Sequence, residues 1–232
     1  EIIRRAEEGG DLTLGEQICA FSALHLCVPS GMMRGEPLIP DIYQQVFIQS
    51  IFDGPERAKG AILSVGARNG KSMVISVILL AFLIGPLAEP NITVASGAMS
   101  RDQAAIVFKL MRDTLLSSPD TTGLWDAVPS SKKIFGIKSN STYMALSADA
   151  KTGYGQDLKV ILLDEAGQIS GPRTDFTDML ESRQGSHDDA LFITCSTQGR
   201  SDGDYLSLAI DGAEREPSDD VVCHVYCAPQ DA

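Results

Sequence analysis

The chain has 232 residues, with 31 acidic side chains against 19 of Lys and Arg, so its formal net charge is -12. This length is enough for one sizeable hydrophobic core, and we expect one α/β domain with a smaller appended element rather than two full domains. The acidity excludes a surface that binds nucleic acid over its whole extent, because phosphate binding needs clustered Lys and Arg. A nucleic-acid contact must therefore come from a local basic patch, for which Lys132, Lys133 and Lys138 are a weak candidate.

Residues 73–88 form the strongly apolar stretch of the chain, which is shorter than the roughly 20 residues needed to span a bilayer. Gly85 and Pro86 interrupt it near its end, so we expect a buried helix and no contact with a membrane. The five cysteines form no CxxC pair and no set with zinc-ligand spacing, a pattern typical of a reduced cytosolic protein.

Residues 1–58 are interpreted as a helical element that is too small to fold as an independent domain. One helix is expected over residues 14–26, after Thr13, and a second over residues 41–52. A loop rich in Pro and Gly separates the two helices. Asp41 follows Pro40 and precedes a run of apolar residues, which predicts that it caps the second helix.

Residues 59–232 alternate short apolar runs with helical stretches, which predicts a mainly parallel central sheet flanked by helices. The expected strands are residues 61–65, 92–95, 160–163, 191–195 and 221–226. The expected helices are residues 71–83, 101–116 and 175–183. Residues 133–147 alternate around a polar centre, which predicts a hairpin inserted into this series.

The segment from Gly66 to Ser72 follows the first apolar run and precedes a long helical stretch. Strand, glycine-containing loop, Lys-Ser and helix is the order that a phosphate-binding loop requires. In that interpretation backbone N–H groups of the loop, including those of Asn69 and Gly70, face the phosphates. Lys71 reaches the outer phosphates and the Ser72 hydroxyl binds Mg²⁺.

The usual spacing of this motif is not met, because Val65 stands five residues before Gly70 and the available glycine, Gly66, lies one residue nearer. A Gly-Lys-Ser sequence can also be an ordinary helix start. Its position between a buried strand and a very apolar helix favours the phosphate loop.

Residues 160–163 lead directly into Asp164 and Glu165. A carboxylate at the end of a buried strand is costly without a cation or a hydrogen-bond partner, so Mg²⁺ is the natural companion of Asp164. Glu165 is placed to polarise an attacking water, which distinguishes a hydrolase from a kinase. A strand that simply ends in a polar turn explains the two acids alone, but not their position downstream of a Gly-Lys-Ser loop.

A third apolar run, residues 191–195, ends in Ser196 and Thr197. In P-loop machines the strand beside the acidic pair carries polar groups that sense the outer phosphate. A Ser-Thr turn that caps a following helix is the alternative interpretation of this segment taken alone.

Taken together, these segments make the chain resemble the ATPase domain of the large terminase subunit of tailed bacteriophages, the motor that packs DNA into capsids. The resemblance covers nearly the whole chain in order. The segments that carry it are residues 37–39 with Tyr43 and Gln44, residues 68–72, residues 101–104, residues 146–151, Asp164 with Glu165, and Ser196 with Thr197. Two details depart from the family pattern: Arg68 stands three residues before Lys71, and Tyr43 replaces the usual tryptophan.

The resemblance implies a P-loop NTPase fold of the RecA/ASCE type and a Mg²⁺-dependent ATPase. It implies that Tyr43 and Gln44 contact the adenine of ATP, that Arg68 acts at the phosphates with Lys71, and that Ser196 and Thr197 couple hydrolysis to movement. The family's nuclease half has no room in this chain.

The same resemblance implies particular partners: double-stranded DNA, a small terminase subunit, a portal protein and further copies of the chain in a ring. The isolated chain is expected to be a monomer, and the expected location is the cytoplasm of the infected bacterial host. Ring motors of this type complete each site with an arginine from a neighbour, for which Arg200 and Arg215 are candidates.

Other classes share part of this pattern. A helicase-like motor carries every catalytic residue named above, although a two-core helicase needs a partner segment. A non-catalytic P-loop interaction module is disfavoured by the presence of both Lys71 and Glu165, and a nucleotide kinase by Glu165.

Overall fold

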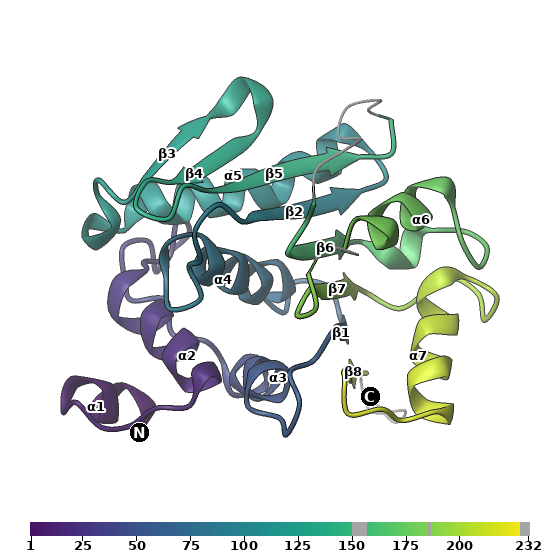
Figure 1. The fold of residues 1–232 in the computed structure, drawn as a ribbon, viewed down its shortest axis with the longest axis horizontal. Helices are drawn as coiled ribbons and strands as arrows, with labels where there is room; N and C mark the ends of the chain where they lie inside the picture. Colours follow the sequence, from purple (N-terminus) through teal and green to yellow (C-terminus); the bar gives the residue numbers. More distant parts are fainter. Residues whose placement is uncertain (150–156, 185–186, 228–232) are drawn as a thin grey trace.

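The computed structural model describes residues 1–149, 157–184 and 187–227, and within them one eight-stranded sheet runs through the molecule (Figure 1). The strands lie in the order β3-β4-β5-β2-β6-β7-β1-β8. Strands β5, β2, β6, β7, β1 and β8 are parallel, whereas β3 and β4 are antiparallel to their neighbours. Their bounds are β1 Gly60–Val65, β2 Thr93–Ala98, β3 Trp125–Val128, β4 Lys133–Gly136, β5 Ser141–Ser147, β6 Val160–Asp164, β7 Leu191–Ser196 and β8 Val221–Tyr226.

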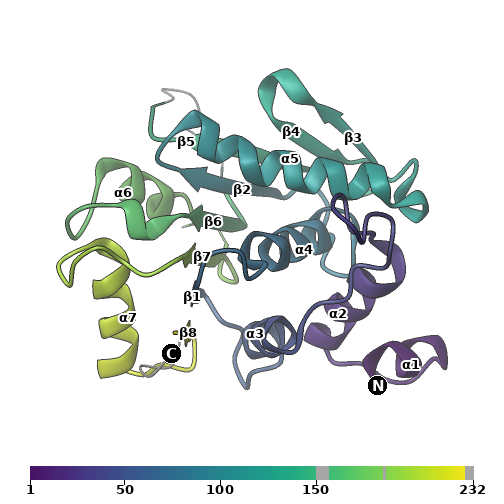
Figure 2. The same cartoon turned by 180° about the vertical axis from the view of Figure 1, so that it is seen from behind.

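Helices cover both faces of this sheet, with α2, α3 and α4 on one side and α6 and α7 on the other (Figures 1 and 2). The α-helices are α1 Ile2–Glu7, α2 Leu14–His25, α3 Ile42–Phe52, α4 Lys71–Ile84, α5 Arg101–Ser117, α6 Asp175–Glu181 and α7 Tyr205–Arg215. Short 3-10 turns are η1 Pro119–Thr121, η2 Pro129–Ser131, η3 Ala166–Gln168 and η4 Ser182–Gln184.

The central strand β6 shows how the two layers share the sheet. Val160 and Leu162 belong to a core formed with α2 to α5, whereas Ile161 and Leu163 belong to a second core formed with α6 and α7. Successive side chains of a strand point to opposite faces, so a strand covered on both sides is apolar throughout. This explains why the run before Asp164 is continuously apolar.

Helix α4 lies in the middle of the first core and is buried along almost its whole length. The apolar stretch that the sequence singled out is therefore a buried helix, as predicted. Within the described ranges, no helix combines the length and the apolar character needed to cross a membrane.

The N-terminal helices begin at capping boxes, in which a side chain and a backbone N–H satisfy each other across the first turn. Thr13 and Glu16 form the one at α2, and Asp41 and Gln44 form the one at α3. The expected capping role of Asp41 is confirmed. Ile18, Phe47 and Ile51 then join the same core as α4, so these helices pack directly on the parallel sheet.

The predicted hairpin over residues 133–147 is present as β4 and β5, but it extends the main sheet rather than standing apart from it. Strand β3 and helix α1 were not predicted. Both are short, and neither contributes a fully buried apolar side chain, so the periodicity that reveals longer elements is absent.

Gly136 marks a close approach between β4 and the end of α4. An added Cβ there would lie 2.3 Å from the carbonyl oxygen of Leu83 and 2.6 Å from Ser141 Oγ. That same carbonyl accepts hydrogen bonds from the hydroxyls of Ser139 and Ser141. The end of α4 is therefore fixed to the β4–β5 turn by contacts that leave no room for a side chain.

We expect Gly136→Ala to lower the free energy of unfolding by about 1–3 kcal/mol, because a Cβ overfills this contact. Gly212→Ala is the matched control, since a Cβ there meets nothing within 4 Å in α7 and alanine favours a helix by about 0.5–1 kcal/mol. Urea denaturation of both variants measures the difference. Equal stabilities would show that α4 is not held at this point.

Candidate functional site

The carboxyl ends of three neighbouring strands meet at one edge of the sheet. Strand β7 lies between β6 and β1, with Asp164 beside Cys195 and Ser64 beside Ser196. The loop after β1, the acidic pair after β6 and the Ser-Thr turn after β7 therefore start side by side. Parallel sheets place their binding sites at this edge.

The loop after β1 turns sharply before α4 begins at Lys71. Arg68 has φ of 65° and Gly70 has φ of 78°, so both adopt the left-handed conformation. The Asn69 side chain donates to the Gly66 carbonyl at 3.2 Å and closes the loop. The first N–H groups of α4 have no partner within the helix and point out of its N-terminal end, where they favour an anion.

Tyr43 and Gln44 of α3 form hydrogen bonds to the backbone of this loop. The Tyr43 hydroxyl donates to the carbonyl of Asn69, and the Gln44 amide donates to the carbonyl of Gly70 at 3.2 Å. A Cβ on Gly70 would lie 2.8 Å from Gln44 Nε2, so glycine is required both by this contact and by the positive φ. The sequence offers a signal for this role of Gln44, because it stands three residues after the capping Asp41.

Lys71 and Glu165 form an ion pair across the site, with 2.5 Å between Lys71 Nζ and Glu165 Oε1. The Lys71 side chain is only 9% exposed and that of Glu165 is 27% exposed. The structure therefore brings the Gly-Lys-Ser loop and the acidic pair together, as the order of the segments predicted. A phosphate that reaches Lys71 must compete with this carboxylate.

Asp164 is 6% exposed and lies at the end of β6. Its Oδ1 accepts a hydrogen bond from the Glu165 N–H at 3.0 Å. Burial and, secondarily, the neighbouring Glu165 charge raise the pKa of Asp164 to about 6, although Lys71 opposes the shift. The negative charge of ionised Asp164 is therefore not fully offset by the cation and hydrogen-bond donor around it.

The residues at this point fit Mg²⁺. Ser72 is the second residue of α4, and Asp164 is a buried carboxyl group in need of a cation. Mg²⁺ commonly takes only one or two protein ligands, with phosphates and waters completing its shell. No cluster of three or more His, Cys, Asp or Glu side chains suited to a metal occurs in the described ranges.

The turn after the acidic pair is tied to the end of β7. Ser196 is fully buried, and its hydroxyl accepts a hydrogen bond from the Gly167 N–H at 2.9 Å. A Cβ on Gly167 would lie 2.9 Å from Ser196 Oγ and from the carbonyl of Thr197. Gly167 was not singled out from the sequence, because its constraint comes from a segment about thirty residues away.

Gln168, in the same turn, accepts a hydrogen bond from Gln103 of α5 at 2.6 Å. The sequence segment 101–104 thus contacts the turn that carries Glu165. The segment 146–151 is described only as far as Asp149, so Ala150 and Lys151 lie outside the described residues.

The three arginines of interest are all exposed. No hydrogen bond or ion pair to Arg68 occurs within the part of the chain that the structure describes. Arg200 follows β7 and lies near Asp204, whose pKa is lowered mainly by the hydrogen bond from the Gly171 N–H and to the smallest extent by the charge of Arg200. Arg215 is 79% exposed at its side chain and pairs with Asp211 at 3.3 Å within α7.

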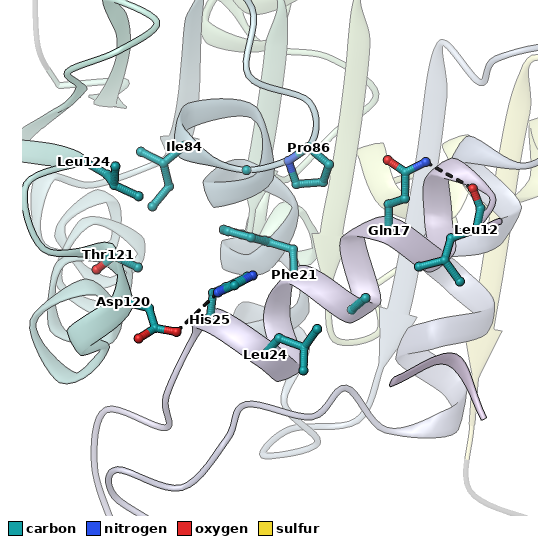
Figure 3. A pocket seen from close by; sticks show the side chains of 12 residues that line it. Leu12, Gln17, Phe21, Leu24, His25, Ile84, Pro86, Asp120, Thr121 and Leu124 are labelled. Carbon is teal, nitrogen blue, oxygen red and sulfur yellow. Dashed lines mark hydrogen bonds and ion pairs between the residues drawn. The ribbon is translucent and has the colours of Figure 1, made fainter. Parts of the chain in front are cut away.

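Two cavities help to locate the site. One, of about 370 Å³, adjoins the loop and is lined by Tyr43, Val65, Gly66, Asn69, Tyr226 and Cys227. A larger one, of about 470 Å³, lies between α2 and the far end of α4 (Figure 3). It is mainly apolar around Phe21, Leu24 and Ile84, with His25 and Asp120 3.4 Å apart at its side. It lies at the other end of α4 from Lys71, so the smaller cavity belongs to the candidate site.

The comparisons with known proteins agree with this geometry. A sequence family described as the ATPase domain of the terminase large subunit matches residues 42–204. The large terminase subunit of Enterobacteria phage HK97 is 42% identical over 221 residues. Its crystal structure superposes with a TM-score of 0.89 over 95% of this chain. The large terminase ATPase domain of Thermus phage P74-26 is 20% identical, with a TM-score of 0.56 over 75% of this chain and 71% of that chain, and shows a shared fold.

The chain spans 44% of the HK97 protein and 45% of the chain in its crystal structure. The predicted resemblance and the P-loop fold class are confirmed. In the strand order β8-β1-β7-β6-β2, one strand, β7, separates the strand that precedes the Gly-Lys-Ser loop from the strand that ends in the acidic pair.

Replacing Asp164 by asparagine is expected to stabilise the metal-free protein at neutral pH. Because the folded-state pKa is raised, the stability contributed by this carboxyl group is complete below about 3.8 and is lost as the pH rises through about 6. Asp164→Asn and the parent should therefore differ little at pH 4. At pH 8 the variant should be more stable by on the order of 2–3 kcal/mol.

Urea denaturation in the presence of a chelator measures this difference at both pH values. Asp202→Asn, which changes an exposed carboxylate, is the control and should show no such pH dependence. A difference for Asp164→Asn that stays constant between the two pH values would contradict the prediction.

Proposed function

The chain belongs to the family of terminase large-subunit ATPase domains, and we propose from that premise that it is the ATP-driven motor that moves double-stranded viral DNA into a procapsid. Membership of this family makes the chain an ATP hydrolase. The observation that carries the proposal is the approach of Lys71 to Glu165, because it puts a phosphate-binding cation and a general base within one site.

In this proposal the loop and the start of α4 bind the phosphates through their N–H groups, and Lys71 neutralises charge on the transferred phosphoryl group. Arg68, exposed on the same loop, adds a second cation. Ser72 and Asp164 would hold Mg²⁺, which would supply positive charge to offset that of the phosphates.

Glu165 accepts the proton of the attacking water. A phosphate bound at Lys71 would compete with Glu165 for the ammonium group, which would free the carboxylate to act as a base. The base is thus available only when the substrate is present.

Ser196 and Thr197 would transmit the state of the outer phosphate to the rest of the chain. The support is the hydrogen bond between Ser196 and Gly167, which links their strand to the turn that carries Glu165. Residues 1–58 would form the adenine side of the site through Tyr43 and Gln44, and residues 59–232 the catalytic core.

The proposed partners are double-stranded DNA, a small terminase subunit, a portal protein and copies of this chain arranged in a ring. The setting is the cytoplasm of the infected bacterial host, and the isolated chain would be a monomer. A ring also reconciles DNA binding with the net charge of -12, since only residues that face the pore need to be basic.

Two substitutions separate binding from hydrolysis. Lys71→Ala should abolish turnover and weaken ATP binding, because it removes charge that both the ground and transition states use. Glu165→Gln should retain binding of ATP with Mg²⁺ but lose hydrolysis, because it preserves shape and removes the base. Calorimetric titration and phosphate release measure the two properties.

Glu214→Gln, an exposed change in α7, is the control and should behave as the parent does. If Lys71→Ala turned over ATP within a few-fold of the parent, the proposed role of Lys71 in ATP hydrolysis would be contradicted. Equal loss of binding and turnover for Glu165→Gln would show that Glu165 is structural.

Turnover per subunit should rise with protein concentration, because the site is completed by an arginine from a neighbouring copy. Such an arginine contributes roughly 10³- to 10⁵-fold in other P-loop enzymes. Arg200→Ala and Arg215→Ala test the two candidates, and a Glu165→Gln subunit should restore activity to whichever variant lacks the contributed arginine. A high specific activity that stays flat in a monomeric sample would instead assign the role to Arg68.

A further inference from the structure

The phosphate end of the site is well supplied with donors, whereas the groups proposed above for the base are only Tyr43 and Gln44. The cavity beside the loop, at about 370 Å³, lies within the ~300–1,000 Å³ typical of ligand pockets. Its lining combines the first residues of the loop with the end of β8. A nucleotide bound at Lys71 and extending along the loop toward Gly66 therefore reaches this cavity with its base.

The side-chain amide of Gln44 has no free N–H left to donate to the edge of a base. Its Oε1 accepts from the N–H of Asp41 at 2.9 Å. Its Nε2 donates to the carbonyl of Gly70 and to the hydroxyl of Tyr43 at 3.2 and 3.3 Å. An amide offers two donors, and both are used here. The cavity must therefore hold the base mainly through the faces of its aromatic side chains.

Tyr226, at the end of β8, is an aromatic residue that lines the cavity beside the loop. It lies beside Val65, the last residue before the loop, in the parallel register of β8 with β1. Its ring packs edge-on against that of Tyr43, with 5.2 Å between centroids and 66° between planes. Two rings at this angle do not form a parallel slot, so a base stacks on one ring and meets the edge of the other.

Of the two tyrosines, only Tyr43 uses its hydroxyl in a hydrogen bond to the loop. Tyr43 is tied to the carbonyl of Asn69, whereas Tyr226 interacts with His224 of its own strand at 3.0 Å. Tyr226 is also 38% exposed, so its ring is accessible from solvent. The ring of His224 packs against that of Phe47 in the core. This contact holds in place the imidazole with which the Tyr226 hydroxyl interacts.

We propose that the nucleobase of bound ATP stacks on the ring of Tyr226, with Tyr43 as the adjoining wall. This inference rests on the proposed ATP-binding function and adds to it a residue for the base, which lies outside the span 42–204 that matches the family. Stacking uses the π face that every base has, so Tyr226 contributes affinity for the nucleoside half of the ligand alone.

Calorimetric titration of the full chain with ATP and with inorganic tripolyphosphate, both with Mg²⁺, separates the two halves of the ligand. Tyr226→Ala should raise the Kd for ATP roughly 5- to 100-fold, the range of one lost base stack. The Kd for tripolyphosphate should not change. Tyr226→Phe should bind ATP as the parent does, because it keeps the ring.

Val221→Ala is the matched control, since Val221 is also 38% exposed on β8 but lies at the opposite end of the strand. It should leave both affinities unchanged. An unchanged Kd for ATP in Tyr226→Ala would overturn the proposal, as would an equal loss for ATP and tripolyphosphate.

Photolabelling of the parent with 8-azido-ATP provides a measurement that needs no variant. We expect the label in the peptide that contains Tyr226, and a label confined to other peptides would overturn the proposal. Failure of the ATPase assignment looks different, because Lys71→Ala would then leave tripolyphosphate binding unchanged.

Discussion

The ion pair between Lys71 and Glu165 is the contact on which the arrangement of the site depends. The two residues lie 94 positions apart in the chain, and they meet because β7 is the only strand between β1 and β6 in the described sheet. Lys71 cannot move freely, since it is the first residue of a helix that the core surrounds. The parallel sheet thus determines where Lys71 and Glu165 lie, and α4 keeps Lys71 in place.

The charges of this site are unevenly compensated by the surrounding side chains. Glu165 has a cationic partner, whereas Asp164 is more deeply buried and has its pKa raised. Ionised groups without full compensation reduce stability, and such groups collect where a substrate or metal is to be bound. In the loop after β1, Arg68 has a positive φ, a strained conformation for a residue other than glycine, and Tyr43 and Gln44 hold the loop in that shape.

Much of this arrangement could be predicted from the sequence, because its strongest signals are local. Residues 160–163 are continuously apolar where both faces of a strand are covered, and Asp41 is the N-cap of a helix in which the Gln44 side chain accepts from the Asp41 N–H. The contacts of Gly167 and Tyr226 could not be predicted in this way. Each depends on the register between strands that are distant in the chain, and neither residue type is unusual at the end of a strand.

Helix α4 has 14 residues, so it extends about 21 Å from Lys71 to the cavity between α2 and the β3 side of the sheet (Figure 3). At that far end Gly85 lies so close to Phe21 that a Cβ would approach the ring to 3.0 Å. A helix enclosed by close-packed side chains does not bend easily, so it responds to a load as a rigid rod. A displacement of Lys71 along the helix axis would therefore be resisted at the far end of α4, where Gly85 lies against Phe21 of α2.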